Sequence, residues 1–176
     1  MPKPEDITAI ADLECIPEEM VPDIVTLLHT VTLEKNEKPI IFHTSMYDRG
    51  SSSESCGHFV AFTNNEFRSY QDVDSLSEVQ FGEISHIIEA NIRGARQLFF
   101  KIEVTPVVGY KYGGIWFTKK VDAPTRIMVK STSVSQPLIT RLENGNRVAV
   151  LNPKIRVPSL EASVLLRHQG APQGGL

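Results

Sequence analysis

Cysteine is scarce in this sequence of 176 residues, and long apolar runs are absent. The two cysteines, Cys15 and Cys56, are too few for a disulfide framework, so a reducing compartment is expected. No stretch approaches the roughly 18 consecutive apolar residues that a membrane span needs. The first ten residues carry neither the basic nor the apolar region of a secretory leader. The sequence therefore predicts a protein that is neither secreted nor inserted in a membrane.

Sequence signals for cofactors are lacking as well. Gly109, Gly113 and Gly114 do not have the strand, loop and helix context of a phosphate loop or a dinucleotide fingerprint. Among the possible metal ligands only Cys56 and His58 are close together, and no paired spacing of a zinc site is present. We therefore expect no cofactor, no metal site and no enzymatic activity.

The composition is that of an ordinary folded protein, with 41% apolar and 22% charged residues, and the length fits one domain. We expect a single α+β domain over residues 16–168, with a mixed or antiparallel sheet and two main helices. Residues 1–15 are acidic and contain two prolines, which predicts a mobile, flexible arm. The Gly- and Pro-rich residues 169–176 predict a disordered tail.

Apolar spacing predicts the positions of the two helices. The first covers residues 22–31, and the second runs from Asp72 or Asp74 to Ile92, where apolar residues recur mostly every three or four positions. Runs of β-branched and aromatic residues predict strands, and Asn144-Gly145 predicts a hairpin turn. The strands are expected at residues 39–47, 58–63, 97–105, 115–121, 125–132 and 147–151.

Charge is distributed unevenly along the chain. Residues 1–89 contain 5 basic and 17 acidic residues, a net charge of 5 − 17 = −12, whereas residues 90–176 contain 13 and 4, a net charge of 13 − 4 = +9. If the halves occupy different faces, copies of the protein attract one another head to tail. The alternative is that the halves intermix in space and their charges neutralise each other locally.

Residues 57–62, Gly-His-Phe-Val-Ala-Phe, resemble the histidine box of ubiquitin-specific proteases. The resemblance implies that His58 is a base and Asp72 the acid that orients it, with Cys15 or Cys56 as the nucleophile. The acidic surroundings of Cys15 do not favour a reactive thiolate. The other interpretation is that His58 is a structural residue on a strand.

A second enzymatic interpretation comes from Arg49, the Ser-Thr-Ser run at 131–133 and Glu161. These residues resemble, in order, elements of one class of ADP-ribosyltransferases, which would imply binding of a nicotinamide dinucleotide. In that family the essential glutamate is the second acid of a Glu-x-Glu pair. Ser163 stands at that position here, so residues 131–133 are better explained as a hydrated strand face.

The stretch from Gly57 to Val79 resembles the matrix proteins of rhabdoviruses, above all the short ones of plant cytorhabdoviruses. In that family a hydrophobic strand leads into an aromatic-Arg-Ser/Thr-Tyr-x-Asp-Val element that opens a helix. Residues 109–118 are similar to a glycine-containing strand entry of the same family. The element is carried here by Phe67, Arg68, Tyr70, Asp72 and Val73.

The resemblance implies a structural protein of the virion, in the host cytoplasm and at the inner membrane face. Such a protein associates with itself, condenses the nucleocapsid and its RNA, and links it to an anionic envelope membrane, where a glycoprotein tail is a further expected partner. In this chain any anionic partner should meet the basic second half. A non-enzymatic adaptor with no viral connection would share most of these properties. The candidate basic surface consists of Lys101, Lys111, Lys119, Lys120, Arg126 and Lys130.

Overall fold

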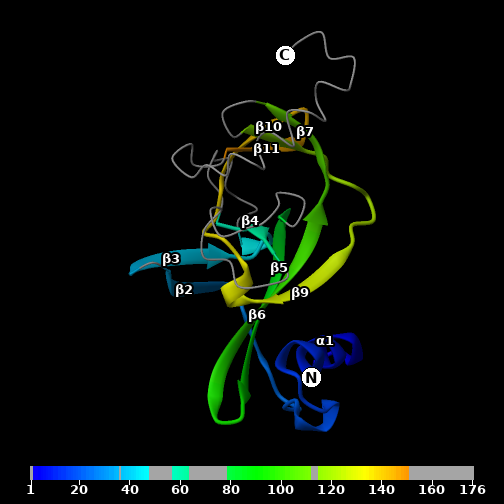
Figure 1. Cartoon of the computed structure of the whole chain (residues 1–176), viewed down its shortest axis with the longest axis vertical. Coiled ribbons are helices and arrows are strands. Elements are labelled where there is room, and N and C mark those ends of the chain that lie inside the picture. The colour runs from blue at the N-terminus through cyan, green and yellow to red at the C-terminus, as the bar shows by residue number, and fades with distance from the viewer. Residues whose placement is uncertain (1, 36, 48–56, 64–78, 112–114, 151–176) are drawn as a thin grey trace.

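The structure, a computed structural model, describes residues 2–35, 37–47, 57–63, 79–111 and 115–150 (Figure 1). In these ranges the chain is mainly antiparallel β-sheet, with α1 (Pro4–Glu14) as the single α-helix. The expected α+β fold with two main helices is therefore wrong. The strands are β1 (Thr26–Leu28), β2 (Thr30–Lys35), β3 (Lys38–His43), β4 (Phe59–Phe62), β5 (Gln80–Ile92), β6 (Ala95–Thr105), β7 (Val107–Lys111), β8 (Ile115–Thr118), β9 (Arg126–Lys130), β10 (Ile139–Glu143) and β11 (Asn146–Val150).

The largest sheet curls into a small barrel built around the long β5–β6 hairpin. Its strands pair in the order β1-β5-β6-β9, and β4 pairs with the first part of β5. After β9 the chain passes through a short 3-10 turn (Ser131–Ser133) and returns alongside β4. Backbone hydrogen bonds from Thr63 to Ser133, from Ser135 to Ala61 and from Leu138 to Phe59 close the ring.

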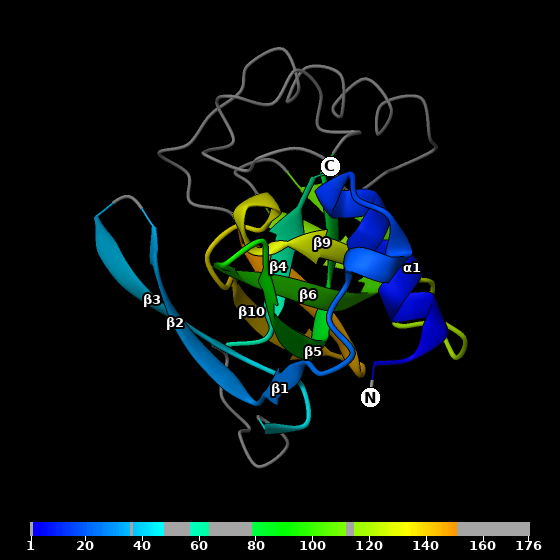
Figure 2. The ribbon, with the colours of Figure 1, turned by 90° about the horizontal axis from the view of Figure 1, so that it is seen from below.

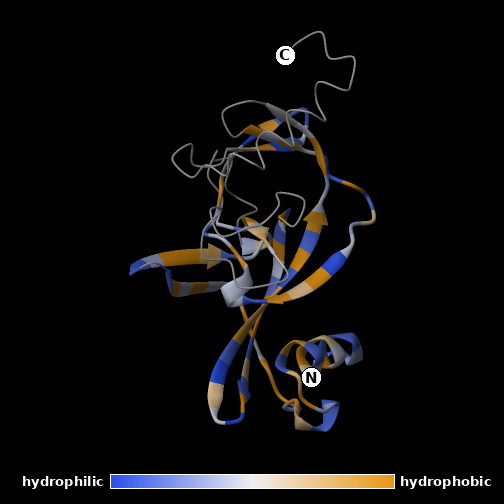
Figure 3. Ribbon diagram, in the orientation of Figure 1, coloured by the Kyte–Doolittle hydropathy of each residue, from blue (hydrophilic) through white to orange (hydrophobic). Residues whose placement is uncertain are grey.

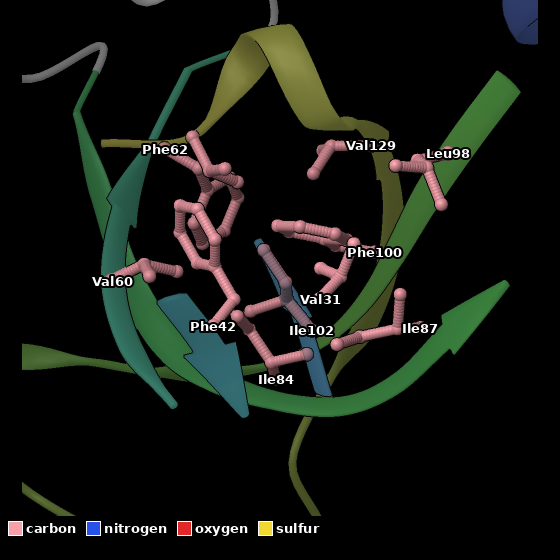
Figure 4. Packing of buried hydrophobic residues seen from close by; sticks show 11 residues of the cluster. Val31, Phe42, Val60, Phe62, Ile84, Ile87, Leu98, Phe100, Ile102 and Val129 are labelled. Carbon is pink, nitrogen blue, oxygen red and sulfur yellow. The ribbon is translucent and has the colours of Figure 1, made fainter. Parts of the chain in front are cut away.

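The interior of this barrel is the main hydrophobic core. Aromatic and β-branched side chains from every wall point inward and meet at its centre (Figure 4). The ring centroids of Phe42 and Phe100 lie 5.2 Å apart. The core residues are Val31, Phe42, Val60, Phe62, Ile84, Ile87, Leu98, Phe100, Ile102, Val129 and Val134.

The β2–β3 hairpin projects from the barrel and supplies part of this core (Figure 1). Val31 and Phe42 stand opposite each other in the hairpin and are both buried in the barrel. Lys35 Nζ donates hydrogen bonds to the carbonyls of Ser131 and Val134, at 3.0 and 2.6 Å. The hairpin is therefore attached to the segment that closes the barrel.

A second antiparallel sheet, ordered β10-β11-β8-β7, follows the barrel in the chain. The expected hairpin turn is confirmed, because Asn144 and Gly145 connect β10 to β11 with φ angles of 51° and 80°. Positive φ at both positions is what a two-residue type I′ turn requires.

Helix α1 packs on the outside of the barrel beside β6 and β9 (Figure 2). Ile10 and Ala11 are buried against Ile88, Ala90 and Phe99 in a second apolar cluster. Pro4 at the first helical turn and acidic residues beside it suit a helix start. The expected flexible arm is therefore wrong for residues 4–14, since burial of one helix face fixes them to the sheet.

The second expected helix is wrong over residues 80–92, which form strand β5. A β-bulge between Ile84 and His86 explains the misleading spacing. Because the bulge shifts the alternation by one residue, Ile84 and Ile87 both face the barrel interior, whereas Ile88 faces α1. A strand buried on both faces and interrupted by a bulge thus imitates helical periodicity.

The first expected helix, residues 22–31, is also wrong. Only Glu18–Met20 forms one short 3-10 turn, η1, and the chain then extends into β1 and β2. Pro22 opposes a regular helix, and the threonines and valines that follow favour strands. None of the helices in the described ranges has the length and apolar character that a membrane span requires.

Each expected strand corresponds to an observed one, namely β3, β4, β6, β8, β9 and β11. The expected tail, residues 169–176, lies outside the described residues.

Candidate functional site

Three of the six residues of the candidate basic surface pair with acids of the same chain. Lys101 Nζ lies 2.8 Å from Asp6 Oδ1, and both side chains are mostly buried, with 13% and 12% exposed. Lys130 Nζ lies 3.5 Å from Glu14 Oε1, whose other oxygen is 3.5 Å from Arg93. The acids come from α1 and the bases from the sheet beneath it. Two of the six candidate residues therefore hold α1 in place.

Three other candidate residues differ in their surroundings. Arg126 is exposed and lies 3.3 Å from Glu103 on the neighbouring strand β6. Lys119 and Lys120 are exposed and form no ion pair within the part of the chain that the structure describes. The backbone of Lys120 donates to Asn146 Oδ1, which fixes the start of the β8–β9 connection against β11.

The sixth candidate, Lys111, is the last residue of β7, and its side chain lies outside the described residues. The motif residues of the matrix resemblance also lie outside the described residues. They are Phe67, Arg68, Tyr70, Asp72 and Val73.

The uneven charge of the sequence is therefore partly neutralised within one molecule. Asp6 and Glu14 from the acidic half pair with bases from the basic half, and so do Glu83 with Arg147 and Glu89 with Arg96. For these residues the acidic and basic halves of the sequence intermix in space, which is the second of the two alternatives above. What remains for a partner is the charge that no residue of the described chain neutralises.

Unpaired acidic charge collects where α1 turns into η1. The acids there have no basic partner among the described residues, and Glu18 Oε1 accepts a hydrogen bond from the Thr8 hydroxyl at 2.8 Å, which joins the two elements. Thr8 and Asp12 lie on the same outward face of α1. We call this surface the acidic end. It consists of Asp12, Glu18, Glu19 and Asp23.

Large apolar side chains are exposed beside the acidic end. These are Met20 in η1, Ile24 after it and Leu27 in β1. The segment that leads from η1 to β1 is mainly apolar (Figure 3). Ile24 is 82% exposed, more than any other large apolar side chain in the described ranges. Exposed apolar groups next to unpaired charge are common in surfaces that bind another protein.

Lys119 and Lys120, which we call the basic rim, lie at the junction of the barrel and the second sheet. The backbone of Lys119 donates to Pro106 at the start of β7. Two exposed apolar side chains, both about 60% exposed, lie on the edge strands of the second sheet, Val108 on β7 and Leu142 on β10, and Leu142 lines the same cavity as Lys120. In Figure 1 the acidic end lies below the barrel, whereas the β8–β9 connection lies beside the second sheet.

A cavity of about 370 Å³ opens next to the basic rim, between the barrel and the second sheet. Its walls combine apolar side chains with three bases and three acids. Two of the acids, Glu83 and Glu103, are held by Arg147 and Arg126. The lining residues are Phe59, Glu83, Glu103, Val104, Thr105, Lys120, Val121, Asp122, Pro124, Arg126, Leu142, Gly145 and Arg147.

Arg147 forms the centre of a hydrogen-bond network at this cavity. Its Nε donates to Glu83 Oε1 at 3.2 Å and its Nη1 to the Thr140 hydroxyl at 3.1 Å, while Nη2 lies 3.2 Å from His58 Nε2. The guanidinium also lies over the ring of Phe59, 5.8 Å from its centroid. The network therefore connects β11 and β10 of the second sheet to the barrel.

His58 and Arg147 strongly favour the ionised form of Glu83. Interaction with His58, 3.7 Å away, contributes most, and Arg147 adds to it, so that the pKa of Glu83 falls from 4.5 to about 2 although burial opposes the change. Glu83 is therefore a carboxylate at any physiological pH.

The protease interpretation depends on residues that the structure only partly describes. His58 is buried, with 5% exposed, and contacts Glu83 and Arg147. Cys15 is exposed at the C-terminal end of α1, where its thiol contacts the Asp12 carbonyl. Cys56 and Asp72 lie outside the described residues. Within the described ranges no three His, Cys, Asp or Glu side chains converge as a metal site would require.

Sequence reasoning did not single out Arg147, Glu83 or the acidic end as a unit. Their partners are distant in sequence, since Arg147 and Glu83 are 64 positions apart. The sequence did show the carboxylates around Cys15, of which Asp12, Glu18 and Glu19 belong to the acidic end.

Comparisons of the chain with protein-family models, curated proteins and solved structures find no match.

Proposed function

We propose that this protein is a non-enzymatic structural protein that associates with copies of itself, with the acidic end of one copy bound to the basic rim of the next. One observation carries the proposal. After the intrachain ion pairs have formed, unpaired charges of opposite sign remain on two different surfaces, and each surface also exposes large apolar side chains. Opposite charge beside apolar area is complementary in the way that protein interfaces require.

Contact between two different surfaces is heterologous and does not need to close into a ring. Repeated from copy to copy, one such contact generates an open chain. Chains that pack side by side would form the extended layer of a matrix-type protein of a virion, which is the role that the resemblance in residues 57–79 implies. Binding to the nucleocapsid, to an anionic membrane or to a glycoprotein tail belongs to the same proposal. The cations open to those partners are fewer than the sequence suggested, because Lys101, Lys130 and Arg126 contact acids of the same chain.

The association should weaken as salt increases. Exposed ion pairs each contribute about 0 to 1 kcal/mol and are screened within about 10 Å at 0.1 M salt. Asp122 lies two residues from Lys120 and offsets part of the positive charge of the basic rim. The contact is therefore expected to be weak for one pair of molecules and to depend on high local concentration.

Sedimentation velocity over a salt series from about 50 to 500 mM tests the proposal. Wild-type protein should form large species at low salt that dissociate at high salt. The variant Lys119→Glu/Lys120→Glu should remain monomeric, and so should Glu19→Lys/Asp23→Lys. A mixture of the two variants should associate again, because each then offers the surface that the other lacks. Lys38→Glu, an exposed charge change on β3, is the control and should associate like the wild type.

A wild-type protein that stays monomeric at low salt and high concentration would contradict the proposal. It would also be contradicted if both charge-reversed variants associated like the wild type.

A further inference from the structure

We infer that the cavity between the barrel and the second sheet is the docking site for Ile24 of a second copy of this chain. This inference rests on the proposed self-association and specifies how the two surfaces meet. Exposed ion pairs alone bind weakly, so a specific contact needs an apolar anchor that is buried on binding. Both the anchor and its receiving cavity are present at the charged surfaces.

Ile24 has the features of an anchor. It is 82% exposed, while Val21 and Val25 on either side of it in the chain pack into the cluster between α1 and the barrel. The backbone is therefore held on both sides of Ile24, and little conformational freedom is lost when its side chain is buried by a partner. Asp23, the residue before Ile24, is exposed and is one of the four acids of the acidic end.

The cavity matches this pair of residues. Leu142 and Val121 provide apolar wall, and Lys120 lies beside them at the basic rim. An isoleucine side chain can therefore enter the cavity while the neighbouring carboxylate of Asp23 meets the ammonium of Lys120. A cavity of about 370 Å³ lies in the size range of protein ligand sites.

The other charges of the cavity favour this occupant over a small free anion. Arg147 is held by Glu83 and Thr140, and Arg126 is held by Glu103. An anion entering the cavity would compete with these carboxylates for the same guanidinium groups. Lys120 has no ion pair among the described residues. Asp122, which also lines the cavity, offsets one charge, so Lys119 and Lys120 together leave net positive charge at the rim, where Asp23 of the second copy would lie.

Disulfide trapping tests the contact directly. In a background of Cys15→Ser and Cys56→Ser, one variant carries Ile24→Cys and a second, size-tagged variant carries Leu142→Cys. A disulfide forms only where Cα atoms come within about 7 Å. Mixing the two variants under mild oxidation at low salt should give a cross-linked dimer of mixed size. Ile41→Cys, which replaces another exposed apolar residue on β3, should give little product with the Leu142→Cys variant.

Substitution provides a second readout. Ile24→Ser should weaken self-association roughly tenfold or more, as expected when a large apolar side chain is no longer buried. Ile41→Ser should leave association unchanged. Both positions are exposed in the monomer, so neither variant should lose its fold, which circular dichroism can confirm.

The outcomes separate the inference from the function on which it rests. If the two charge-reversed variants restore association on mixing, but Ile24→Ser associates like the wild type and cross-linking at position 24 is no better than at 41, then self-association stands and the docking of Ile24 is overturned. If the wild type does not associate at all, both are overturned. Loss of association in Ile24→Ser together with selective cross-linking supports both.

Discussion

Asp6 of helix α1 and Lys101 of strand β6, 95 positions apart, form an ion pair of 2.8 Å on the outer wall of the barrel. The pair connects the acidic N-terminal segment to the basic half of the same chain. Together with the contacts of Glu14 it explains why residues 4–14 are a docked helix and do not extend as an arm. Part of the charge asymmetry of the sequence thus serves to attach α1 to the barrel through ion pairs within one molecule.

Removal of Asp6 should destabilise the protein. Asp6→Ala leaves the ammonium of Lys101 mostly buried without its partner, which should cost about 2 to 4 kcal/mol of unfolding free energy in urea titrations. Glu5→Ala, at an exposed position on the same helix, is the matched control and should change stability by less than about 0.5 kcal/mol.

The double variant Asp6→Ala/Lys101→Met should recover most of the loss, because it removes the unpaired charge. A cost for Asp6→Ala no larger than that for Glu5→Ala would show that the pair does not hold α1.

His86 reports on the same ion pair. Partial burial and the nearby charge of Lys101 lower its pKa below the ordinary value, whereas Asp6 raises it. Lys101→Met should therefore raise the pKa of His86, and Asp6→Asn should lower it further. Titration of the imidazole proton signals by NMR measures both changes. Shifts of the same sign in both variants would contradict the arrangement.

Glu83 should make stability depend on acidity. Its pKa is about 2 in the folded protein and near 4.5 when unfolded, so the stabilisation is fully present above about pH 4.5 and is lost as the pH falls through 2. The difference corresponds to about 3 kcal/mol. Glu83→Gln should thus be less stable than the wild type at pH 6, and the gap should shrink toward pH 2.

Urea unfolding at several pH values measures this gap. Glu34→Gln, at an exposed position on β2 without an ion pair among the described residues, is the matched control. If the gap for Glu83→Gln stayed constant from pH 6 to pH 2.5, the network around Arg147 would not stabilise the carboxylate.

Local sequence signals succeeded where one feature determines the structure. Asn144-Gly145 predicted its turn because the two residues tolerate positive φ, and short β-branched or aromatic runs predicted six strands. They failed for β5, because a bulge at residues 84–86 and burial of both faces produce the spacing of an amphipathic helix.

The candidate site could be predicted only in part. Exposed Lys119 and Lys120 were identified, but the same reasoning also included Lys101 and Lys130, whose acidic partners lie on α1. Whether a lysine is free or paired depends on which strands meet which helix. Arg147 was missed for the same reason, since its partners come from β5, β10 and the residue before β4.

Gly82 should be required for the close approach of β5 and β6. A Cβ atom at this position would lie 2.5 Å from the backbone oxygen of Glu103 and from the Ile102 side chain. Gly82→Ala should therefore push the strands apart and cost about 2 to 4 kcal/mol. Gly94→Ala, in the β5–β6 turn, meets no atom within 4 Å but requires φ of +77°, so it should cost only about 1 kcal/mol.

Comparison of the two alanine variants separates the two effects. Both remove backbone freedom from the unfolded chain in the same hairpin, but only Gly82→Ala adds a clash inside the barrel wall. Urea unfolding should rank Gly82→Ala well below Gly94→Ala, and amide hydrogen exchange should show reduced protection in β5 and β6 for Gly82→Ala alone. Equal costs would contradict the close approach of β5 and β6 at Gly82.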